Sequence, residues 1–420
     1  MNFLLNWKWI VVGAVGCIVL VFAAWFFFFR SSAELVSTAP TSVDFGIANE
    51  RPGVAGQGET NTPGGATNEP FTPSQNTQNQ KIFQLAAGPI AGAVLIQTTR
   101  PTTTLARFIM AESGRVFDLP LDVPGALPRS VSNTTIPGIA RALWLPEGLG
   151  ALVQYESDGV RKTLFLGLVN ASTTLNASAN PQPTHIQYLP DNIIDLALSP
   201  DGKNVAYLLT TKSGVDGHVA KSDGTGAKKL FSSPLSQALL SWPAANTLLL
   251  QTKSVYGALG AAFSVDTRTG ALSTLFFANA LSSIADKTFS RVIYQTVLDS
   301  GIRTTFVHDL ARNRDTGLSF SPIPSKCVWG ATATSTLYCA TPLQYVPPNY
   351  MDLWLMGLAG AADSLVSFNV TGGSSLIRAT PGTDGGVPSD MIEISPSPDE
   401  KYLSFIRRSD RTLWGIRLTQ

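Results

Sequence analysis

The chain has few of the residues on which most catalytic and metal sites depend. Its 420 residues include three histidines and three cysteines, and 14% of them are charged, against about a quarter in a typical soluble domain. The net charge is +1, and without a basic cluster the composition argues against a nucleic-acid-binding surface. His185, His218 and His308 are not spaced to join a cysteine pair around a metal ion. The sequence therefore predicts neither a metal ion nor a cofactor.

Catalytic motifs are also missing. A serine hydrolase needs a G-x-S-x-G nucleophile elbow on a strand-to-helix turn, and the nearest match, Gly372 to Ser375, is typical of a loop. There is no zinc-binding H-E-x-x-H, no phosphate-binding P-loop and no EF-hand calcium loop. We therefore expect no catalytic residue that can be recognised from a local motif.

A single long apolar run lies at the N-terminus. Residues 9–29 carry no charge and are bounded by Lys8 and Arg30. A bilayer core needs about 20 apolar residues in a helix, whereas the apolar region of a cleavable signal peptide has about 7–15. The sequence predicts an uncleaved transmembrane signal-anchor helix at 9–29 after a short tail at 1–8. We expect the N-terminus in the cytoplasm and the domain that follows outside it, in a periplasm or at the cell surface.

Residues 30–80 are rich in Pro, Gly, Thr and Asn and show almost no apolar pattern. Such a segment cannot bury enough surface to offset the entropy of ordering it. We predict a disordered linker, with an r.m.s. reach of about 40 Å for 50 residues of flexible coil. An ordinary linker without further function explains the same composition.

The stretch from Asp195 to Leu209 indicates a β-hairpin. Apolar residues alternate on both sides of Ser199-Pro200-Asp201-Gly202, and Pro, Asp and Gly each favour a tight turn for a separate reason. A degenerate copy around Pro398-Asp399 closes the chain. Turn anchors follow one another at roughly 40–60 residues, near the length of one four-stranded propeller blade. They begin at Gly88, Leu145, Ser199, Trp242, Ala285, Gly330 and Pro398.

These anchors predict an all-β fold, a β-propeller of seven four-stranded blades over residues 81–420. A count of six or eight blades is also compatible with the sequence, because the first and fifth copies are poor matches. We expect a strand near the start of the domain to pair with the last blade, since closing the ring protects the sheet edges.

The segments LALSPDGKNVAYLL and HVAKSDGTGAKKL resemble repeats in the propeller domains of the Tol-system periplasmic protein and of prolyl-oligopeptidase-type peptidases. The resemblance is strong over about 191–231 and fair over 391–418. It implies a propeller fold. The peptidase domain that accompanies such propellers has no counterpart in the sequence, and neither does the WD signature of WD-type repeats.

Cysteines and tryptophans recur at positions that suggest structural roles. Cys327 and Cys339 bracket a hairpin-like segment, so they can form a cross-strand disulfide outside the cytoplasm or remain buried thiols in a reducing compartment. Recurring aromatic residues at equivalent blade positions favour packing between blades, with an aromatic ligand platform as the alternative. The tryptophans concerned are Trp144, Trp242, Trp329, Trp354 and Trp414, the last two expected in strands.

The sequence favours a binding protein over an enzyme. We expect a membrane-anchored, extracytoplasmic scaffold that binds a protein or an envelope polymer, not nucleic acid. The alternative is a carbohydrate-active hydrolase or lyase that uses carboxylates in the propeller channel, because such acids come from different blades and leave no local motif. Acids that could face the channel are Asp191, Asp195, Asp286, Asp299 and Glu393, and each could equally belong to a turn or a strand edge.

Overall fold

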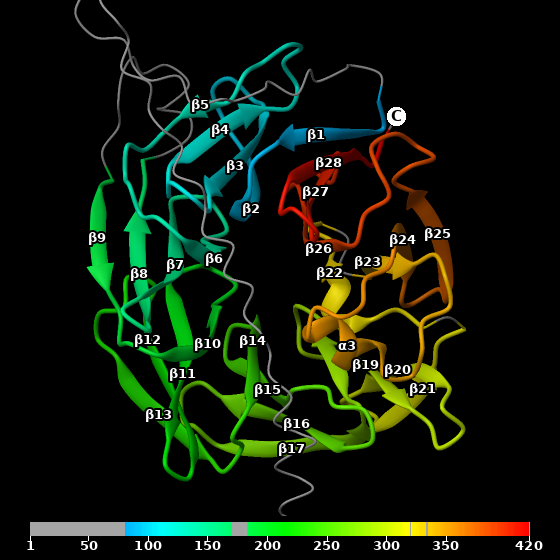
Figure 1. Cartoon of the computed structure of the whole chain (residues 1–420). Helices are drawn as coiled ribbons and strands as arrows, with labels where there is room; N and C mark the ends of the chain where they lie inside the picture. Colours follow the sequence, from blue (N-terminus) through cyan, green and yellow to red (C-terminus); the bar gives the residue numbers. More distant parts are fainter. Residues whose placement is uncertain (1–79, 170–182, 320, 333–334, 420) are drawn as a thin grey trace, which may run out of the picture. The chain divides into compact units, whose positions relative to one another are not determined.

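The computed structural model describes residues 80–169, 183–319, 321–332 and 335–419. These residues form seven antiparallel sheets of four strands each, arranged around a ring (Figure 1). The predicted seven-bladed β-propeller is therefore confirmed. The expected transmembrane segment at 9–29 and almost all of the expected linker lie outside the described residues, and no helix within the described ranges is long and apolar enough to cross a membrane.

The first strand of each blade lies toward the centre of the ring and the fourth toward the outside (Figure 1). Blades 1 to 3 consist of β2 (Ile90–Gln97), β3 (Thr104–Met110), β4 (Val116–Pro120), β5 (Arg129–Ser130); β6 (Ile139–Trp144), β7 (Gly150–Ser157), β8 (Val160–Gly167), β9 (His185–Tyr188); and β10 (Ile193–Leu198), β11 (Asn204–Thr211), β12 (Gly214–Lys221), β13 (Lys228–Ser233).

Blades 4 to 6 consist of β14 (Ala238–Ala244), β15 (Thr247–Thr252), β16 (Leu259–Asp266), β17 (Leu272–Asn279); β18 (Ser282–Ala285), β19 (Arg291–Val297), β20 (Arg303–Asp309), β21 (Arg314–Gly317); and β22 (Cys327–Trp329), β23 (Thr336–Pro342), β24 (Asp363–Asn369), β25 (Ser374–Ala379). A 3₁₀ helix, η1 (Pro324–Lys326), precedes β22, and the helix α3 (Tyr350–Leu355) lies between β23 and β24.

Blade 7 combines both ends of the described chain. Strands β26 (Met391–Pro396), β27 (Tyr402–Arg407) and β28 (Leu413–Arg417) pair in order, and β1 (Ile82–Ala86) adds the fourth strand by pairing antiparallel with β28. Ile82 lies opposite Ile416 in this pairing. The expected closure of the ring by an N-terminal strand is therefore confirmed, and it leaves β28 without a free edge.

The core consists of seven hydrophobic clusters, one between each pair of neighbouring blades. Middle strands are buried on both faces, and every residue of β3 (TLARFIM) is buried. The blades therefore stabilise one another by face-to-face packing. Removing apolar area from water in this way is the main favourable contribution to folding.

The predicted turn motif forms the connection between the first and second strands of blade 3. The Ser199 hydroxyl donates to Asp201 at 2.7 Å and accepts from the Asn204 amide at 2.9 Å. Ser397 repeats both bonds in blade 7, to Asp399 at 2.7 Å and from the Tyr402 amide at 3.0 Å. Pro200, Gly202 and Pro398 lie in these same two turns. The predicted repeat motif thus shapes turns.

The expectation for the first turn anchor, at Gly88, is wrong. Gly88 and Pro89 connect β1 to β2, that is, blade 7 to blade 1, instead of the first two strands of a blade. The corresponding turn of blade 1 is Thr98 to Thr103, where the Thr98 hydroxyl accepts from the Thr103 amide at 3.2 Å. Threonine hydroxyls replace the Asp-Gly chemistry there, so the pattern of the other blades does not reveal it.

The expectation that Trp354 lies in a strand is also wrong. It lies in α3, not in a strand. The short run DLWLMGL is compatible with either element, because the period of so few apolar residues does not separate helix from strand. α3 belongs to an insertion, residues 343–362, between the second and third strands of blade 6.

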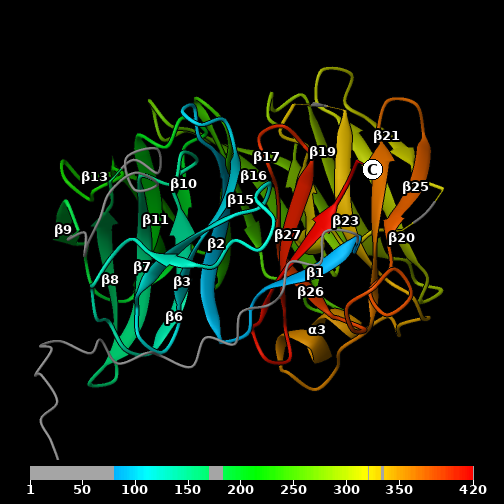
Figure 2. The same cartoon turned by 90° about the horizontal axis from the view of Figure 1, so that it is seen from above.

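The ring has two distinct ends. Connections between second and third strands lie at one end, which we call the α3 end because α3 extends beyond the strands there (Figure 2). Connections between first and second strands, including the turn at Ser199, lie at the opposite end. The amide of Arg417, at the close of β28, donates to the Lys81 carbonyl at 2.9 Å, so the chain enters the propeller at the opposite end.

Candidate functional site

Asp195 joins three innermost strands. It lies on β10, accepts the Leu240 amide of β14 at 2.7 Å, and pairs with Arg141 of β6 at 3.2 Å. A β-bulge between Ile193 and Asp195 re-aims this side chain. Its carboxylate oxygens are therefore engaged in connecting blades 2, 3 and 4.

Glu393 is the predicted acid whose pKa is raised by its environment. It lies on β26 at φ 50° and pairs with Arg411 at 3.2 Å. Although the side chain is 38% exposed, desolvation among the surrounding strands raises the pKa of Glu393, while Arg411 and Arg141 act in the opposite direction. Glu393 therefore faces two cations, as expected of a structural ion pair.

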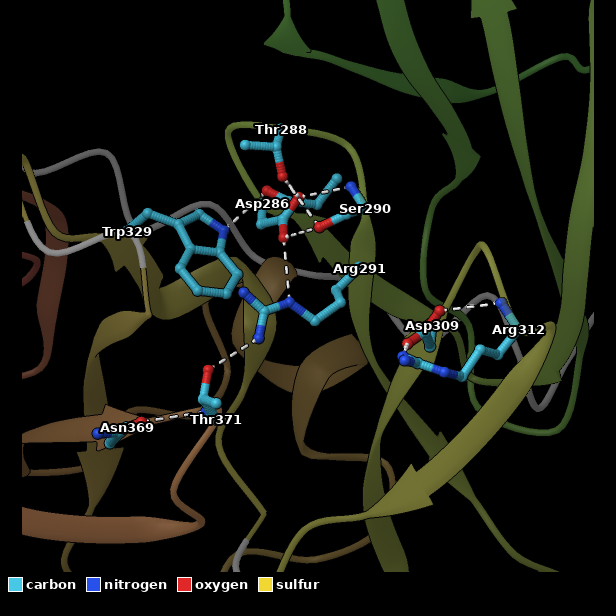
Figure 3. Close-up of polar contacts among 10 residues, drawn as sticks. Asp286, Thr288, Ser290, Arg291, Asp309, Arg312, Trp329, Asn369 and Thr371 are labelled. Atoms are coloured by element: carbon cyan, nitrogen blue, oxygen red, sulfur yellow. Dashed lines mark hydrogen bonds and ion pairs between the residues drawn. The ribbon is translucent and has the colours of Figure 1, made fainter.

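Asp286 closes the turn between β18 and β19. Its carboxylate accepts the Ser290 amide and hydroxyl, both at 2.8 Å, and Arg291 at 3.2 Å (Figure 3). Although burial acts to raise it, these donors together lower the pKa of Asp286. Asp286 is a turn residue, fully occupied by its own loop.

Asp191 and Asp299 do not point to a shared site. Asp191 pairs with Lys162 at 2.7 Å, and Asp299 lies in the exposed connection between β19 and β20. Among the residues that the structure describes, no group of three or more His, Cys, Asp or Glu is placed to hold a metal ion. The five predicted channel acids are thus distributed over separate ion pairs and turns.

A cavity of about 460 Å³ lies between blades 5 and 6. Arg291 borders it and donates to Asp286 on one side and to the Thr371 hydroxyl on the other, at 3.1 Å (Figure 3). Asn369 shapes the far wall by accepting the Gly372 amide at 2.8 Å. The charged groups that line this cavity are thus already engaged, Arg291 with Asp286 and Asp309 with Arg312.

The predicted blade-packing tryptophans occupy the hydrophobic clusters, with Trp354 as the exception. Trp144 lies in the cluster between blades 1 and 2, Trp242 between blades 3 and 4, Trp329 between blades 5 and 6, and Trp414 between blades 6 and 7. Trp329 also donates to the Ala285 carbonyl of blade 5 at 2.7 Å. The aromatic rings thus fill spaces between blades.

Cys327 and Cys339 face each other across β22 and β23 and form a disulfide, with Cα atoms 4.1 Å apart. His308 contacts Asp315 through Nδ1 at 2.9 Å, His218 stacks on Tyr207, and His185 lies 6.2 Å from the Phe165 ring centroid. None of the three histidines shares a cluster with the predicted acids.

A concentration of exposed apolar side chains at the α3 end was not predicted from the sequence. More than half of the exposed large apolar residues in the described ranges lie in connections of blades 4, 5 and 6 at this end or at the strand end directly beside one. Tyr345 is 87% exposed and Leu358 is 73% exposed. We call this set the apolar surface; it comprises Val255, Tyr256, Leu259, Leu298, Ile302, Leu343, Tyr345, Leu355, Met356 and Leu358.

The blade 6 insertion unites these connections. The Tyr256 amide of blade 4 donates to Asp352 of α3 at 3.0 Å, and Arg303 of blade 5 donates to the Val346 carbonyl at 3.2 Å. The insertion also has its own small core around Tyr350 and Met351. The apolar surface is therefore held in a defined conformation, which reduces the entropy that binding would cost.

A buried ionic cluster fastens the insertion to blade 7. Arg408 donates to the Ala359 carbonyl at 2.8 Å, and its guanidinium lies 4.4 Å from the centroid of the Trp354 ring. The Trp354 indole donates to Asp390 at 2.8 Å. Lys326 belongs to the same cluster and forms ion pairs with Asp363 and Asp390. Trp354 thus connects the insertion to the ring.

Comparisons with known proteins bear on the fold. No family model and no curated protein matches the chain. An oligogalacturonate lyase in complex with manganese matches with a TM-score of 0.54 at 11% identity over 83% of this chain and 96% of that chain. The oligogalacturonate lyase of Vibrio parahaemolyticus gives 0.50 at 9% over the same shares. TolB from Acinetobacter baumannii gives 0.42 at 10% over 67% and 62%.

This chain is a β-propeller. At such low identities the likeness concerns the fold alone, and folds of this kind carry many functions. What the repeat resemblance implied about the fold, a propeller, is present as seven four-stranded sheets.

Proposed function

We propose that the chain is a membrane-anchored, extracytoplasmic scaffold that binds a protein partner through the apolar surface. The observation that carries this proposal is the gathering of exposed apolar side chains from three blades at one end of the ring. Contiguous exposed apolar patches on soluble proteins commonly mark interaction sites. Tyr256 and Tyr345 add aromatic side chains of the type enriched at interfaces.

The position of the chain's entry favours a protein over the membrane as the occupant. Lys81 lies beside Arg417, at the end of the ring opposite the apolar surface. An anchor at 9–29 joined through 30–80 would thus attach to the end remote from that surface. The attachment point would then not obstruct the apolar surface, which leaves it open to a protein partner in the extracytoplasmic space.

Site-specific photocrosslinking in intact cells tests the proposal. We expect full-length protein with a photoreactive phenylalanine analogue at Tyr345, Leu358 or Ile302 to capture the same extracytoplasmic protein. The matched control is Leu127, which is 62% exposed but lies in the connection between the third and fourth strands of blade 1, at the opposite end.

A charged substitution completes the test. Leu358→Glu in the Tyr345 crosslinking background is expected to abolish the product, because a carboxylate in an apolar interface is desolvated without a partner. A product that forms equally from position 127, or that survives Leu358→Glu, would exclude the apolar surface as the binding site.

The alternative function, a carbohydrate-active enzyme, requires a different arrangement of side chains. A glycosidase needs two carboxylates about 5–9.5 Å apart that are available to the substrate. Asp195 and Glu393, the candidates on innermost strands, are each paired with an arginine. The ion pairs therefore favour the binding function, and an assay of oligosaccharide cleavage by wild-type protein and by Glu393→Gln would separate the two.

A further inference from the structure

Lys326 and Asp363 form an unusually enclosed pair. The Lys326 side chain is 1% exposed and the Asp363 side chain 0%. Lys326 Nζ lies 2.5 Å from Asp363 Oδ2 and 2.7 Å from Asp390 Oδ1. Burying such charges costs several kcal/mol per ion before their attraction is counted. The site thus holds an amine against a carboxyl group, out of water, with a second carboxylate alongside.

We propose that Lys326 and Asp363 condense to an intramolecular amide bond. Nζ forms a bond to Cγ of Asp363, the bond from Cγ to Oδ1 breaks, and Oδ1 leaves as water. Of the three protons on the Lys326 ammonium, two leave with that water and one remains on the amide nitrogen. The reaction requires no oxidant, metal or cofactor.

The two oxygens of Asp363 have different surroundings, and each fits its part in this reaction. Oδ2 accepts the Met391 amide at 2.8 Å, which would stabilise the negative charge that develops on that oxygen during attack. Oδ1 is buried and has no hydrogen-bond partner among the described residues. Such an orphaned buried acceptor is unfavourable, and its departure as water removes it.

Asp390 is placed to move the proton. It contacts Lys326 directly, and the Trp354 indole at 2.8 Å and the Arg408 guanidinium at 3.5 Å fix its carboxylate. A carboxylate within hydrogen-bond reach of the amine can accept its proton and pass it to the leaving oxygen. Burial raises the pKa of Asp363 to about 6, so the neutral acid that condensation needs is more accessible than for an exposed aspartate.

The product would keep the main hydrogen bonds of the reacting groups. The amide oxygen would keep the Met391 hydrogen bond, and the amide N–H would donate to Asp390. The bond would connect η1, where the chain enters blade 6, to the start of β24. Unlike the nearby disulfide, this connection would survive reducing conditions.

The mass of the wild-type full-length protein tests the bond. After reduction and alkylation, we expect a mass lower than the sequence requires by one water molecule. Trypsin should not cut after Lys326, because the side chain no longer carries a charge. The next basic residue is Arg378, so the loss should appear in a looped peptide of residues 315–378. Further cleavage by chymotrypsin should yield a two-chain peptide joined at Lys326 and Asp363.

The more exposed pair Lys162 and Asp191, 2.7 Å apart, is the internal control, and trypsin should cut after Lys162 normally. Full mass together with complete cleavage after Lys326 would overturn the proposal. In Asp390→Asn, checked for folding by circular dichroism, we expect full mass and cleavage after Lys326. If Asp390→Asn lost one water molecule as completely as the wild type does, Asp390 would be excluded as the proton carrier. If the variant does not fold, the wild-type digest still decides the existence of the bond.

Discussion

Arg107 provides a demanding test of how the blades are held together. It is fully buried in blade 1, and its guanidinium forms a bidentate pair with Asp118 at 2.7 and 2.8 Å. The same group reaches blade 2, where it donates to the carbonyls of Gly148 at 2.7 Å and Val169 at 3.1 Å. One side chain thus joins two sheets through four hydrogen bonds.

Replacing Arg107 with methionine would leave the Asp118 carboxylate buried without its guanidinium and remove the donor from two carbonyls. Breaking a buried pair from one side costs about 3–5 kcal/mol, and we expect Arg107→Met to lower the free energy of unfolding by that amount. Adding Asp118→Leu should restore part of the loss, because the buried charge disappears while the carbonyls stay unpaired.

Urea unfolding of full-length protein in mild detergent, followed by tryptophan fluorescence, measures these differences. The control is Arg312→Met, because Arg312 is 76% exposed in its pair with Asp309 and exposed pairs contribute about 0–1 kcal/mol. If Arg107→Met cost no more than Arg312→Met, the argument from burial would be refuted.

Three further predictions follow from local geometry. Gly202→Ala should destabilise more than Gly226→Ala, because both have φ +68° but only at Gly202 would a Cβ approach a proline ring of blade 2, at 2.7 Å; thermal unfolding of the two variants compares them, and equal losses would contradict the close contact. Replacing Cys327 and Cys339 with serine should lower stability by about 2–3 kcal/mol, since their 12-residue separation sets a modest loop-closure entropy; chemical denaturation under non-reducing conditions checks this. The hydrogen bond from Arg407 lowers the pKa of Asp410 from 3.8 to about 2. The ionised Asp410 carboxylate therefore stabilises the fold above about pH 4, and this contribution is lost as the pH falls to about 2. The difference in melting temperature between wild type and Asp410→Asn should shrink over that interval, and a constant difference would argue against the lowered pKa.

Local turn chemistry made the fold predictable. Ser199 and Asp201 satisfy the backbone of their own hairpin, so the sequence motif and the structure are two descriptions of one set of hydrogen bonds. Ser397 shows that the motif survives the loss of glycine, because Glu400 takes the position of Gly202 with φ 54°. This position is left-handed in both copies, which is tolerable but less favourable for a residue with a side chain.

What the local pattern could not predict are the bonds between blades. Glu400 accepts hydrogen bonds from the Thr332 amide at 2.7 Å and the Tyr338 hydroxyl at 2.9 Å. The glutamate that replaces glycine in this copy of the motif therefore connects blade 7 to blade 6. Likewise, Asp195 could be named from the sequence, but its arginine partner Arg141 lies on another blade. The sequence places Trp354 in a strand and not in α3, because the seven residues of DLWLMGL do not define a period.

The apolar surface escaped prediction for a geometric reason. Its residues come from three connections, near Tyr256, Ile302 and Tyr345, which are about 45 residues apart along the chain and meet because each blade repeats the same path from one end of the ring to the other. In the sequence each connection contains only two to five exposed apolar residues, a number that is ordinary for a soluble protein. The repeat that makes the fold predictable therefore also gathers such residues at one end, so a search for function in a propeller should compare equivalent connections of successive blades. The entry of the chain at the other end follows from the same path, because β1 pairs with the last blade at the far side from α3. The proposed anchor would join the ring at that end, so its attachment and the proposed binding surface would use different ends of the propeller.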